Sequence, residues 1–398
     1  MINELVINIS VEMENCSIIP KKGTTINEQL DNCYLQLSQY LETHNLKKSN
    51  IIKQTIFTSD TENVGFLKNK KLILDFSRKF FNVFIPTCIV PQPPLNNALV
   101  AFEISIIPEG EHAEIIRKKI GNLEYIVVQT TKSTQIIACG LGSEKETTDI
   151  YLQSIDAFEQ MHNILLVENM DFSNVVRQWN YIENIIGYSS NNQHYQIFND
   201  VRSAFYGQSH FRHGYPAATG IGMETGGVII DFIALREKSN TSVNPLKSPV
   251  QNDAHQYSRE VLAHNEKDQV AAETTPKFER AKAIVTNNKC FIYVSGTAAI
   301  KGQHSFSSND VSAQTRLTLD NIIQLVSIEN LKNNNINFLS SNLTPSYLRV
   351  YIKNISDYFK VKDICESYVE NIPVIYLKAD ICRPELLVEI EGMFFSEF

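Results

Sequence analysis

The residues best suited to chemistry lie near the C-terminus, in the stretch ADICRPELLVEIEG at 379–392. Glu389 stands there between Val388 and Ile390, on what reads as a largely apolar strand. A carboxylate is rarely buried unless it is paired, because the interior does not replace the hydration that the charge loses. Glu389 is therefore either a solvent-facing residue of an edge strand or a carboxyl whose pKa is raised by burial. A carboxyl of the second kind can deliver a proton near neutral pH.

Two nearby residues bear on this choice. Glu391 is two positions beyond Glu389 and on a strand points to the same face, so it could replace Glu389 or tune it, and alternation alone does not separate the two. Cys382 lies seven residues before Glu389. A single cysteine is more often a small buried hydrophobe than a reactive thiol, so the residue type by itself assigns Cys382 no role.

The composition limits the classes of function. The 398 residues are 43% hydrophobic and 20% charged, which is typical of a globular protein with ample core. A net charge of −8 and the lack of a Lys/Arg-rich run argue against a nucleic-acid partner. The acidic N-terminus is unlike a signal peptide, and no apolar run is long enough to span a membrane. The seven cysteines are scattered without a CxxC pair, so we expect a cytoplasmic protein with reduced thiols and no membrane partner.

Three weakly similar copies of one pattern predict the elements that position these residues. Each copy reads as a strand, a long amphipathic helix, a strand, a second helix and paired closing strands. The last copy runs from the strand at 290–300 through helices at 310–327 and 357–369, and the middle copy from 134–143 through a helix at 149–168. The first copy is only partial. In each copy the final apolar strand carries an acid, and these acids are Glu103, Asp231 and Glu389.

The pattern predicts an α/β (α+β) fold in which three modules form a pseudo-trimer within one chain. We place a degenerate N-terminal module at 1–120, a middle module with substrate-binding residues at 121–236 and a C-terminal module with the acid at 276–398. The polar segment between them, at 237–275, is a long excursion of the kind that is commonly functional or disordered. Tyr257 and Val261 within it suggest that it docks in part.

The motifs of the last copy resemble the Rid family (reactive-intermediate deaminases). The resemblance rests on Gln314-Thr315, Leu319 and Asn321-Ile322 on the helix, and on the RPELLVEIE ending at 383–391. Rid proteins form trimers with ligand sites between subunits and use a glutamate at the VEIE position to handle a proton. The order of strands and helices in the three copies fits such modules, with mixed sheets that each pack against two helices.

Four longer stretches resemble the chorismatases, which are monomeric Rid-like enzymes. These stretches are FYGQSHFRHGYPAATGIG at 205–222, NPLKSPVQNDAHQY at 244–257, VSGTAAIKGQHS at 294–305 and LKADICRPELLVEIEG at 377–392. The resemblance covers roughly residue 120 to the end. The second stretch departs from the family because it lacks the Arg/Tyr-rich run expected there, and substrate orientation or product choice can differ if that run shapes the pocket.

The resemblance implies cofactor-free cleavage of chorismate to pyruvate and 3-hydroxybenzoate, in a monomer whose active site lies between the middle and last modules. Glu389 is then the general acid that protonates the enolpyruvyl methylene. A cysteine at the position of Cys382 and a glycine at that of Gly296 accompany the aromatising members, whereas alanine in place of the cysteine accompanies release of a dihydrodiol. Related enzymes with this C-terminal ending yield both 3- and 4-hydroxybenzoate, so both products stay open.

Chorismate is a dianion, and arginine suits two-pronged recognition of carboxylates. The candidates are Arg202, Arg212 and Arg349, with Arg316 and Arg383 as weaker ones, although each taken alone is more often an ordinary surface residue. Tyr206, four residues after Arg202 on a helix, and Tyr215 are candidate hydrogen-bond partners of the substrate.

Two further motifs bear on ligand binding. Thr219 and Gly220 open a glycine turn, TGIG, whose amides could hold a carboxylate, although its spacing fits neither a phosphate loop nor a dinucleotide fingerprint. His210, His213 and His304 have no spacing that places two on one face, so no metal site is expected.

Two other functions stay open on the residues alone. A Rid-type imine hydrolase would use the same glutamate with one arginine, and a non-catalytic binder of small carboxylates would keep the pocket without turnover. The long tyrosine-containing segment and the additional arginines of the middle module argue against the imine hydrolase.

Overall fold

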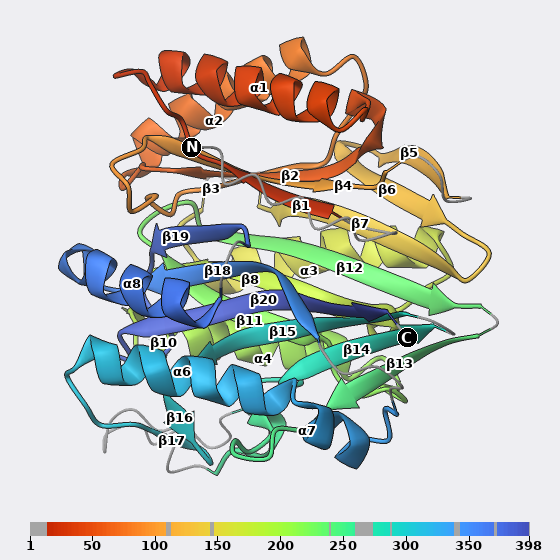
Figure 1. Cartoon of the computed structure of the whole chain (residues 1–398), viewed down its shortest axis with the longest axis vertical. Helices are drawn as coiled ribbons and strands as arrows, with labels where there is room; N and C mark the ends of the chain where they lie inside the picture. The colour runs from red at the N-terminus through yellow and green to blue at the C-terminus, as the bar shows by residue number, and fades with distance from the viewer. Residues whose placement is uncertain are drawn as a thin grey trace.

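Three large sheets, each covered by helices, and two short hairpins make up the part of the chain that the structure describes (Figure 1). The computed structural model describes residues 14–108, 113–143, 147–238, 240–258, 274–286, 289–337, 343–369 and 372–397. None of the described helices is long and apolar enough to cross a membrane.

The first sheet has four strands and packs against two helices. Its strands, in spatial order, are β1 (Glu14–Ile18), β4 (Val100–Ile106), β2 (Ile51–Thr58) and β3 (Thr87–Val90). The helices are α1 (Ile26–Thr43) and α2 (Asn63–Phe80). Thr25 caps α1 in a reciprocal pair with Glu28, which satisfies backbone donors at the helix start and fixes where α1 begins.

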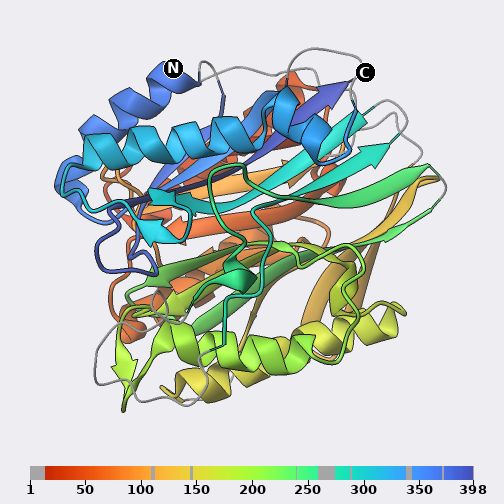
Figure 2. The same cartoon turned by 90° about the horizontal axis from the view of Figure 1, so that it is seen from below.

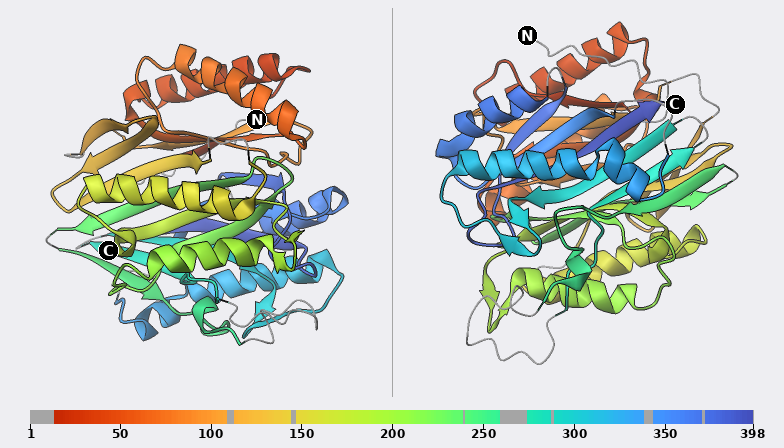
Figure 3. Two further views of the ribbon diagram at one scale, coloured as in Figure 1. Left: turned by 180° about the vertical axis from the view of Figure 1, so that it is seen from behind. Right: turned by 60° about the horizontal axis from the view of Figure 1, so that its bottom comes forward.

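The second sheet has six strands. In spatial order they are β11 (Ala217–Met223), β8 (Val175–Glu183), β12 (Val228–Glu237), β7 (Ser133–Gly142), β6 (Leu123–Gln129) and β5 (Glu114–Ile120). Helices α3 (Ile150–Val167) and α4 (His194–Tyr206) pack against one another and cover the sheet (Figure 3, left). The short hairpin β9 (Tyr188–Ser189) and β10 (Asn192–Gln193) precedes α4.

The third sheet also has six strands. In spatial order they are β13 (Thr241–Leu246), β14 (Ala281–Thr286), β15 (Lys289–Ala298), β20 (Val388–Glu397), β18 (Thr344–Ile352) and β19 (Val374–Lys378). Its helices are α6 (Val311–Leu325), the short α7 (Ile328–Asn333) and α8 (Tyr358–Tyr368), and a small hairpin pairs β16 (Ile300–Lys301) with β17 (His304–Ser305). The Asp310 side chain accepts a hydrogen bond from the Ser312 amide and so caps α6, at the first residue of the helix expected at 310–327.

The same four-strand unit recurs in all three sheets. The spatial orders β1-β4-β2-β3, β7-β12-β8-β11 and β15-β20-β18-β19 are equivalent, and in each the last two strands are parallel while the others are antiparallel. The predicted fold class of three repeated α+β modules in one chain is therefore confirmed. The closing strands, however, do not pair with each other. They lie on either side of the middle strand, because the first of them returns parallel to it after a helical crossover.

The first unit is complete rather than partial. It includes α2, which was not recognised in the sequence because Phe66, Ile73 and Ser77 are its buried residues and Glu62 gives it no side-chain cap. No capping signal therefore marks where α2 begins.

Two strand pairs extend the second and third units. The edge strand β5 belongs to the second sheet although it lies within 1–120, and β13 pairs with β14 although it lies within the connecting segment at 237–275. Residues 259–273 of that segment, including Val261, lie outside the described residues. The domain boundaries remain a proposal. On these pairings we place them at about residues 109 and 240 rather than at 120 and 236.

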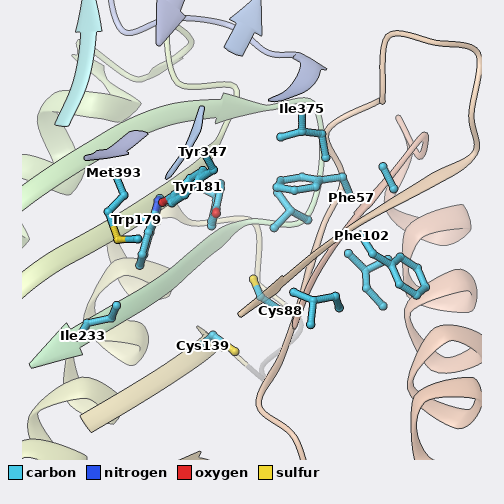
Figure 4. Close-up of a cluster of buried hydrophobic side chains, with 14 of the residues drawn as sticks. Phe57, Cys88, Phe102, Cys139, Trp179, Tyr181, Ile233, Tyr347, Ile375 and Met393 are labelled. Carbon is cyan, nitrogen blue, oxygen red and sulfur yellow. The ribbon is translucent and has the colours of Figure 1, made fainter. Parts of the chain in front are cut away.

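The sheets meet in the middle of the molecule and the helices lie outside them. Figure 2 shows α6 and α8 on one side, α3 and α4 on the opposite side, and the sheets between them. One buried apolar cluster contains residues from all three units, among them Phe57, Trp179 and Tyr347 (Figure 4). Separate clusters fill the space between sheet and helices in the second and third units. Units that share a core in this way hold one another in place.

Candidate active site

A pocket lies between the second and third units, where the sequence analysis placed the site. It encloses about 630 Å³, including its mouth. The second unit contributes residues of α4 and its N-cap, the connecting segment contributes Tyr257, and the third unit contributes the rest. The lining residues are Gln193, Tyr195, Gln196, Asn199, Tyr257, Pro276, Phe278, Arg280, Gly296, Ala298, Ile300, Cys382, Arg383, Leu386 and Glu389.

Glu389 lines the pocket from β20. Its backbone is paired with Ala298 on one side and Tyr351 on the other, so the strand is central in its sheet and not at an edge. The side chain is only 4% exposed and forms no salt bridge with any residue that the structure describes. Burial, and then the neighbouring Glu391, raise the pKa of Glu389 to about 8, against a smaller opposing effect of Arg177 and Arg280. Glu389 is therefore a mostly neutral carboxyl at pH 7.

Glu391 faces the same side but sits among cations. Its Oε2 lies 2.5 Å from Arg177 Nη2 and its Oε1 lies 2.9 Å from Arg349 Nη1. Oε1 also accepts a hydrogen bond from Trp179 Nε1 at 2.9 Å, and Oε2 accepts one from the Thr219 hydroxyl. Burial pushes the pKa of Glu391 upward, but Arg177 and Arg349 together hold it below its usual value. The two glutamates, equivalent by alternation, thus differ in charge, and Glu389 is the one that can act as an acid.

Cys382 lines the pocket as a partly buried free thiol. Burial, with a further effect of Glu389, raises its pKa to about 12. At neutral pH it is therefore a thiol that can donate or accept a proton weakly, and not a thiolate nucleophile.

Gly296 forms the pocket wall against Glu389. A Cβ built at this position would overlap Glu389 Oε1, so the backbone here must lack a side chain for the carboxyl to take its place. The Gly296 amide donates to the Thr219 hydroxyl at 3.0 Å, which links this wall to the bonds around Glu391.

Two arginines that contact Tyr257 line the pocket. Arg280 donates through Nε and Nη2 to the Asn252 carbonyl and through Nη2 to the Tyr257 hydroxyl. Arg383 donates through Nη1 to the Gln303 carbonyl at 2.9 Å and to Ser305 Oγ at 3.0 Å. Both guanidiniums lie over the Tyr257 ring, at 5.5 and 5.2 Å from its centroid. The pocket therefore combines a neutral acid with two fixed positive charges.

The arginines favoured from the sequence lie elsewhere. Arg202 is buried behind pocket-lining Asn199, to whose Oδ1 its Nη2 donates at 2.5 Å, and its Nε has no hydrogen-bond partner among the described residues. Arg349 is bound to Glu103 and Glu391 in the centre of the molecule. Arg212 is exposed in the turn after α4. Of the three, only Arg202 contacts a residue that lines the pocket, which is Asn199, and Arg202 itself does not line it.

The two tyrosines belong to an aromatic cluster below α4. The Tyr206 hydroxyl donates to Gln178 Oε1 at 2.6 Å, and its ring lies stacked 6.0 Å from that of Tyr215. Tyr215 is half-buried, and its amide donates to Glu279 Oε1. Neither tyrosine lines the pocket.

The TGIG motif is a strand and not a turn. Residues 219–222 lie within β11, where the Gly222 amide donates to the Asp380 carbonyl. A Cβ at Gly220 would overlap the Tyr195 ring, so this glycine admits the pocket-lining tyrosine. Thr219 accepts from Arg177 Nη2 at 2.8 Å, and its role is therefore to hold charged side chains rather than a ligand.

The pocket residues of α4, which begins at His194, were missed in the sequence. Gln193, its N-cap, makes no side-chain cap hydrogen bond, so no capping signal marked the start. Tyr195, Gln196 and Asn199 lie on the first half of this helix. Arg280 was missed because it lies in a loop before β14. The histidines considered for metal do not line the pocket, and no cluster within the described ranges has metal-binding composition.

Comparisons with known proteins agree with the motifs. The family model of the chorismatase FkbO/Hyg5-like N-terminal domain matches residues 110–234. A 3-hydroxybenzoate synthase of Streptomyces hygroscopicus is 29% identical over 237 residues, which is 57% of this chain and 65% of that protein. A chorismatase of Streptomyces rapamycinicus is 29% identical over 57% of this chain and 66% of its own length. The chain thus spans just under two thirds of the curated relatives that it matches.

The fold comparison extends further. A chorismatase crystal structure superimposes with a TM-score of 0.66 at 19% identity, over 97% of this chain and 99% of that one. The first unit, which lies outside the family-model match, is included in this likeness. The chain is therefore similar to the chorismatases in sequence over 57% of its length, and similar in fold to a chorismatase over nearly all of it.

Proposed function

We propose that the chain is a chorismatase that converts chorismate to pyruvate and 3-hydroxybenzoate without a cofactor. The observation that carries this proposal is Glu389, a buried carboxyl that is neutral near pH 7 and faces a pocket with two arginines. The relationship to proteins named chorismatase and 3-hydroxybenzoate synthase supports the same reaction.

The first step is proton transfer to carbon. Glu389 donates its proton to the terminal methylene of the enolpyruvyl group, which becomes a methyl group, and the positive charge moves to the adjacent carbon and ether oxygen. Carbon protonation is slow without a positioned acid, and an acid is most effective when its pKa lies near the working pH. With a pKa of about 8, Glu389 holds its proton in roughly ten molecules for each ionised one at pH 7.

The substrate's two carboxylates require cations. Arg280 and Arg383 are held by hydrogen bonds that leave part of each guanidinium free to face the pocket. Because both arginines line the pocket, each can meet one anionic group of the same ligand. Arg202 supplies a third positive charge behind Asn199.

Cleavage then needs no outside reactant. The ring hydroxyl oxygen attacks the neighbouring ring carbon and loses its proton, while the bond from that carbon to the pyruvyl oxygen breaks and its electron pair leaves with pyruvate. The Cys382 thiol assists opening of the resulting arene oxide, and loss of a ring proton gives the aromatic product. Pyruvate and 3-hydroxybenzoate together contain all the atoms of chorismate, so neither water nor an oxidant is consumed.

The test is to incubate the purified protein with chorismate and to measure pyruvate and the aromatic products by chromatography. Pyruvate with 3-hydroxybenzoate supports the proposal, and a share of 4-hydroxybenzoate would extend it. Pyruvate with a dihydrodiol would keep Glu389 as the acid and remove Cys382 from the scheme. If no pyruvate forms, the chorismatase proposal fails, and the alternatives are an imine hydrolase or a non-catalytic binder of small carboxylates.

Two variants assign the roles. Glu389→Gln keeps shape and hydrogen bonding but has no acidic proton, so turnover is lost while chorismate binding remains. Cys382→Ala keeps pyruvate release and shifts the second product from 3-hydroxybenzoate toward the dihydrodiol. Unchanged turnover in Glu389→Gln would contradict the mechanism.

A further inference from the structure

The three units carry the same pair of charged positions. The acids Glu103, Asp231 and Glu389 lie on the equivalent strands β4, β12 and β20. On the neighbouring strand of each unit stands a basic residue that pairs in register with the position two beyond the acid. These register pairs are Lys53 with Ser105, Arg177 with Ile233, and Arg349 with Glu391.

Two of the three interfaces between units are closed by an ion pair between these positions. Lys53 of the first unit lies 2.8 Å from Asp231 of the second. Arg349 of the third unit binds both oxygens of Glu103 of the first, at 2.6 and 3.2 Å. Both pairs are buried, so each acid at these interfaces has a fixed cation in place of a ligand.

The same relation at the third interface would pair Arg177 of the second unit with Glu389 of the third. Arg177 instead binds Glu391, at 2.5 Å. The positions equivalent to Glu391 are Ser105 and Ile233, so the third unit alone carries a second acid there. Thr219 holds the arrangement, because its hydroxyl contacts both the Arg177 guanidinium and Glu391 Oε2.

We propose that Glu391 is a positioning residue that draws Arg177 away from Glu389, and that this turns an ion-paired interface site into an acid site. Glu391 has two cations, Arg177 and Arg349, and is ionised, so it adds a fixed negative charge beside Glu389. With Arg177 bound elsewhere and a negative neighbour on the same strand, Glu389 is stable in its neutral form. The benefit to catalysis rests on the function proposed above, whereas the protonation state does not.

The other groups around Glu389 do not replace Arg177. Cys382 and Tyr195 are uncharged near neutral pH, because burial raises the pKa values of both. Arg280 and Arg383 point part of their guanidiniums toward carbonyl and hydroxyl oxygens, and no salt bridge joins either to Glu389 within the described part of the chain. Among the nearby cations, Arg177 is the one whose equivalents at the other interfaces bind the corresponding acid.

Two variants test the proposal because they should act in opposite directions. Glu391→Gln removes the negative charge and frees Arg177, so we expect the pKa of Glu389 to fall by at least about one unit, a tenfold change in its proton equilibrium. Arg177→Gln removes the cation, so we expect that pKa to rise. A purely structural defect in the network would move both variants in the same direction.

The measurement is the neutral-carboxyl infrared band of Glu389, titrated in each full-length variant with carbon-13 glutamate and identified by its loss in Glu389→Gln. The pH profile of kcat/KM for chorismate is the second readout. In each variant its fall at alkaline pH should have the same apparent pKa as the loss of the infrared band. Asp231→Asn is the matched control. It removes an equally buried, paired acid at another interface, so it should lower stability and leave the Glu389 titration unchanged.

Shifts of the same sign in the two variants, or no shift in either, would overturn the proposal. If Glu391→Gln fails to fold, Thr219→Val removes the hydroxyl clamp and should lower the Glu389 pKa in the same direction. If the wild type does not turn over chorismate but the band shifts in opposite directions, the proposed function fails while the inference about Glu391 stands. If the wild type turns over chorismate but both variants shift the band in one direction, the proposed function stands and the inference about Glu391 fails.

Discussion

Glu389 and Glu391 show how two identical side chains, two residues apart, acquire different charges. Both are buried, so both lose hydration, and the difference comes from their partners. Glu391 has two arginines and three further donors, whereas Glu389 faces the pocket. A neutral buried acid has a measurable effect on folding, because its proton is held in the native state and lost in the unfolded state.

This effect gives the first prediction, for Glu389→Gln. Between the ordinary carboxyl pKa of 4.5 and the native value of about 8, the native state binds a proton that the unfolded state does not. The unfolding free energy of the wild type therefore falls as pH rises through this window, by at most about 1.4 kcal/mol per pH unit. Relative to the wild type, Glu389→Gln should gain stability between pH 5 and pH 8. Urea unfolding of both proteins at pH 5 and pH 8 measures the difference in unfolding free energy between Glu389→Gln and the wild type. If that difference is the same at both pH values, Glu389 is ionised in the native state.

Gly296 gives a second prediction at this scale. Gly296→Ala places a methyl group where Glu389 Oε1 now lies, so the carboxyl must move and kcat should fall at least about tenfold for a displaced acid. Gly65→Ala is the control. Its site in α2 leaves room for a methyl group, and alanine favours a helix by about 1 kcal/mol. Steady-state kinetics and thermal unfolding of the two variants check this prediction. If Gly296→Ala is as active as Gly65→Ala, the absence of a side chain at Gly296 is not needed to position the Glu389 carboxyl.

At the scale of elements, strands β2, β8 and β18 carry the basic residues that meet acids of another unit. Each ion pair joins two strands that are far apart in the sequence, as Lys53 on β2 joins Asp231 on β12. Burying such a pair costs hydration on both sides, so the pair orders the interface more than it stabilises the fold.

The third prediction concerns this pair. Lys53→Met leaves Asp231 buried without its cation, which should cost about 3–5 kcal/mol of unfolding free energy. Adding Asp231→Leu removes the uncompensated charge, so the double variant should recover most of that loss. Chemical denaturation of the single and double variants measures the coupling. A double variant as unstable as the sum of both single variants would mean that the two residues act independently.

At the scale of the whole molecule, the three sheets pack against one another within one chain. Each sheet therefore uses the face that could otherwise pack against another subunit. The shared cluster that includes Phe57, Trp179 and Tyr347 lies at this meeting place. The sheet faces that meet at this cluster are covered within the chain, so they are not available to bind a second copy.

The fourth prediction is therefore a monomer in solution. Analytical ultracentrifugation at micromolar concentration should give a mass of 45.2 kDa. A species of three times this mass, with activity that depends on protein concentration, would show that the pocket is completed between chains.

The sequence alone determined the repeated order of elements, the class of fold and the candidate acid. Apolar periodicity and caps such as Asp310 are local features, so they could be read directly. The repeat also placed acids at Glu103, Asp231 and Glu389 on equivalent strands, which the register confirms. Helix α2 and the start of α4 were missed, and neither helix has a side-chain cap hydrogen bond that would mark its first residue.

Only the tertiary structure decided which charges meet. Arg177, Arg280 and Arg349 look alike in the sequence, yet one lines the pocket and two lie in the central ion network. Alternation put Glu389 and Glu391 on one face, and the arrangement of strands across the unit interfaces then gave one of them its cations. Charge state depends on neighbours contributed by distant segments, and for that reason packing rather than sequence spacing separates the acid from its partner.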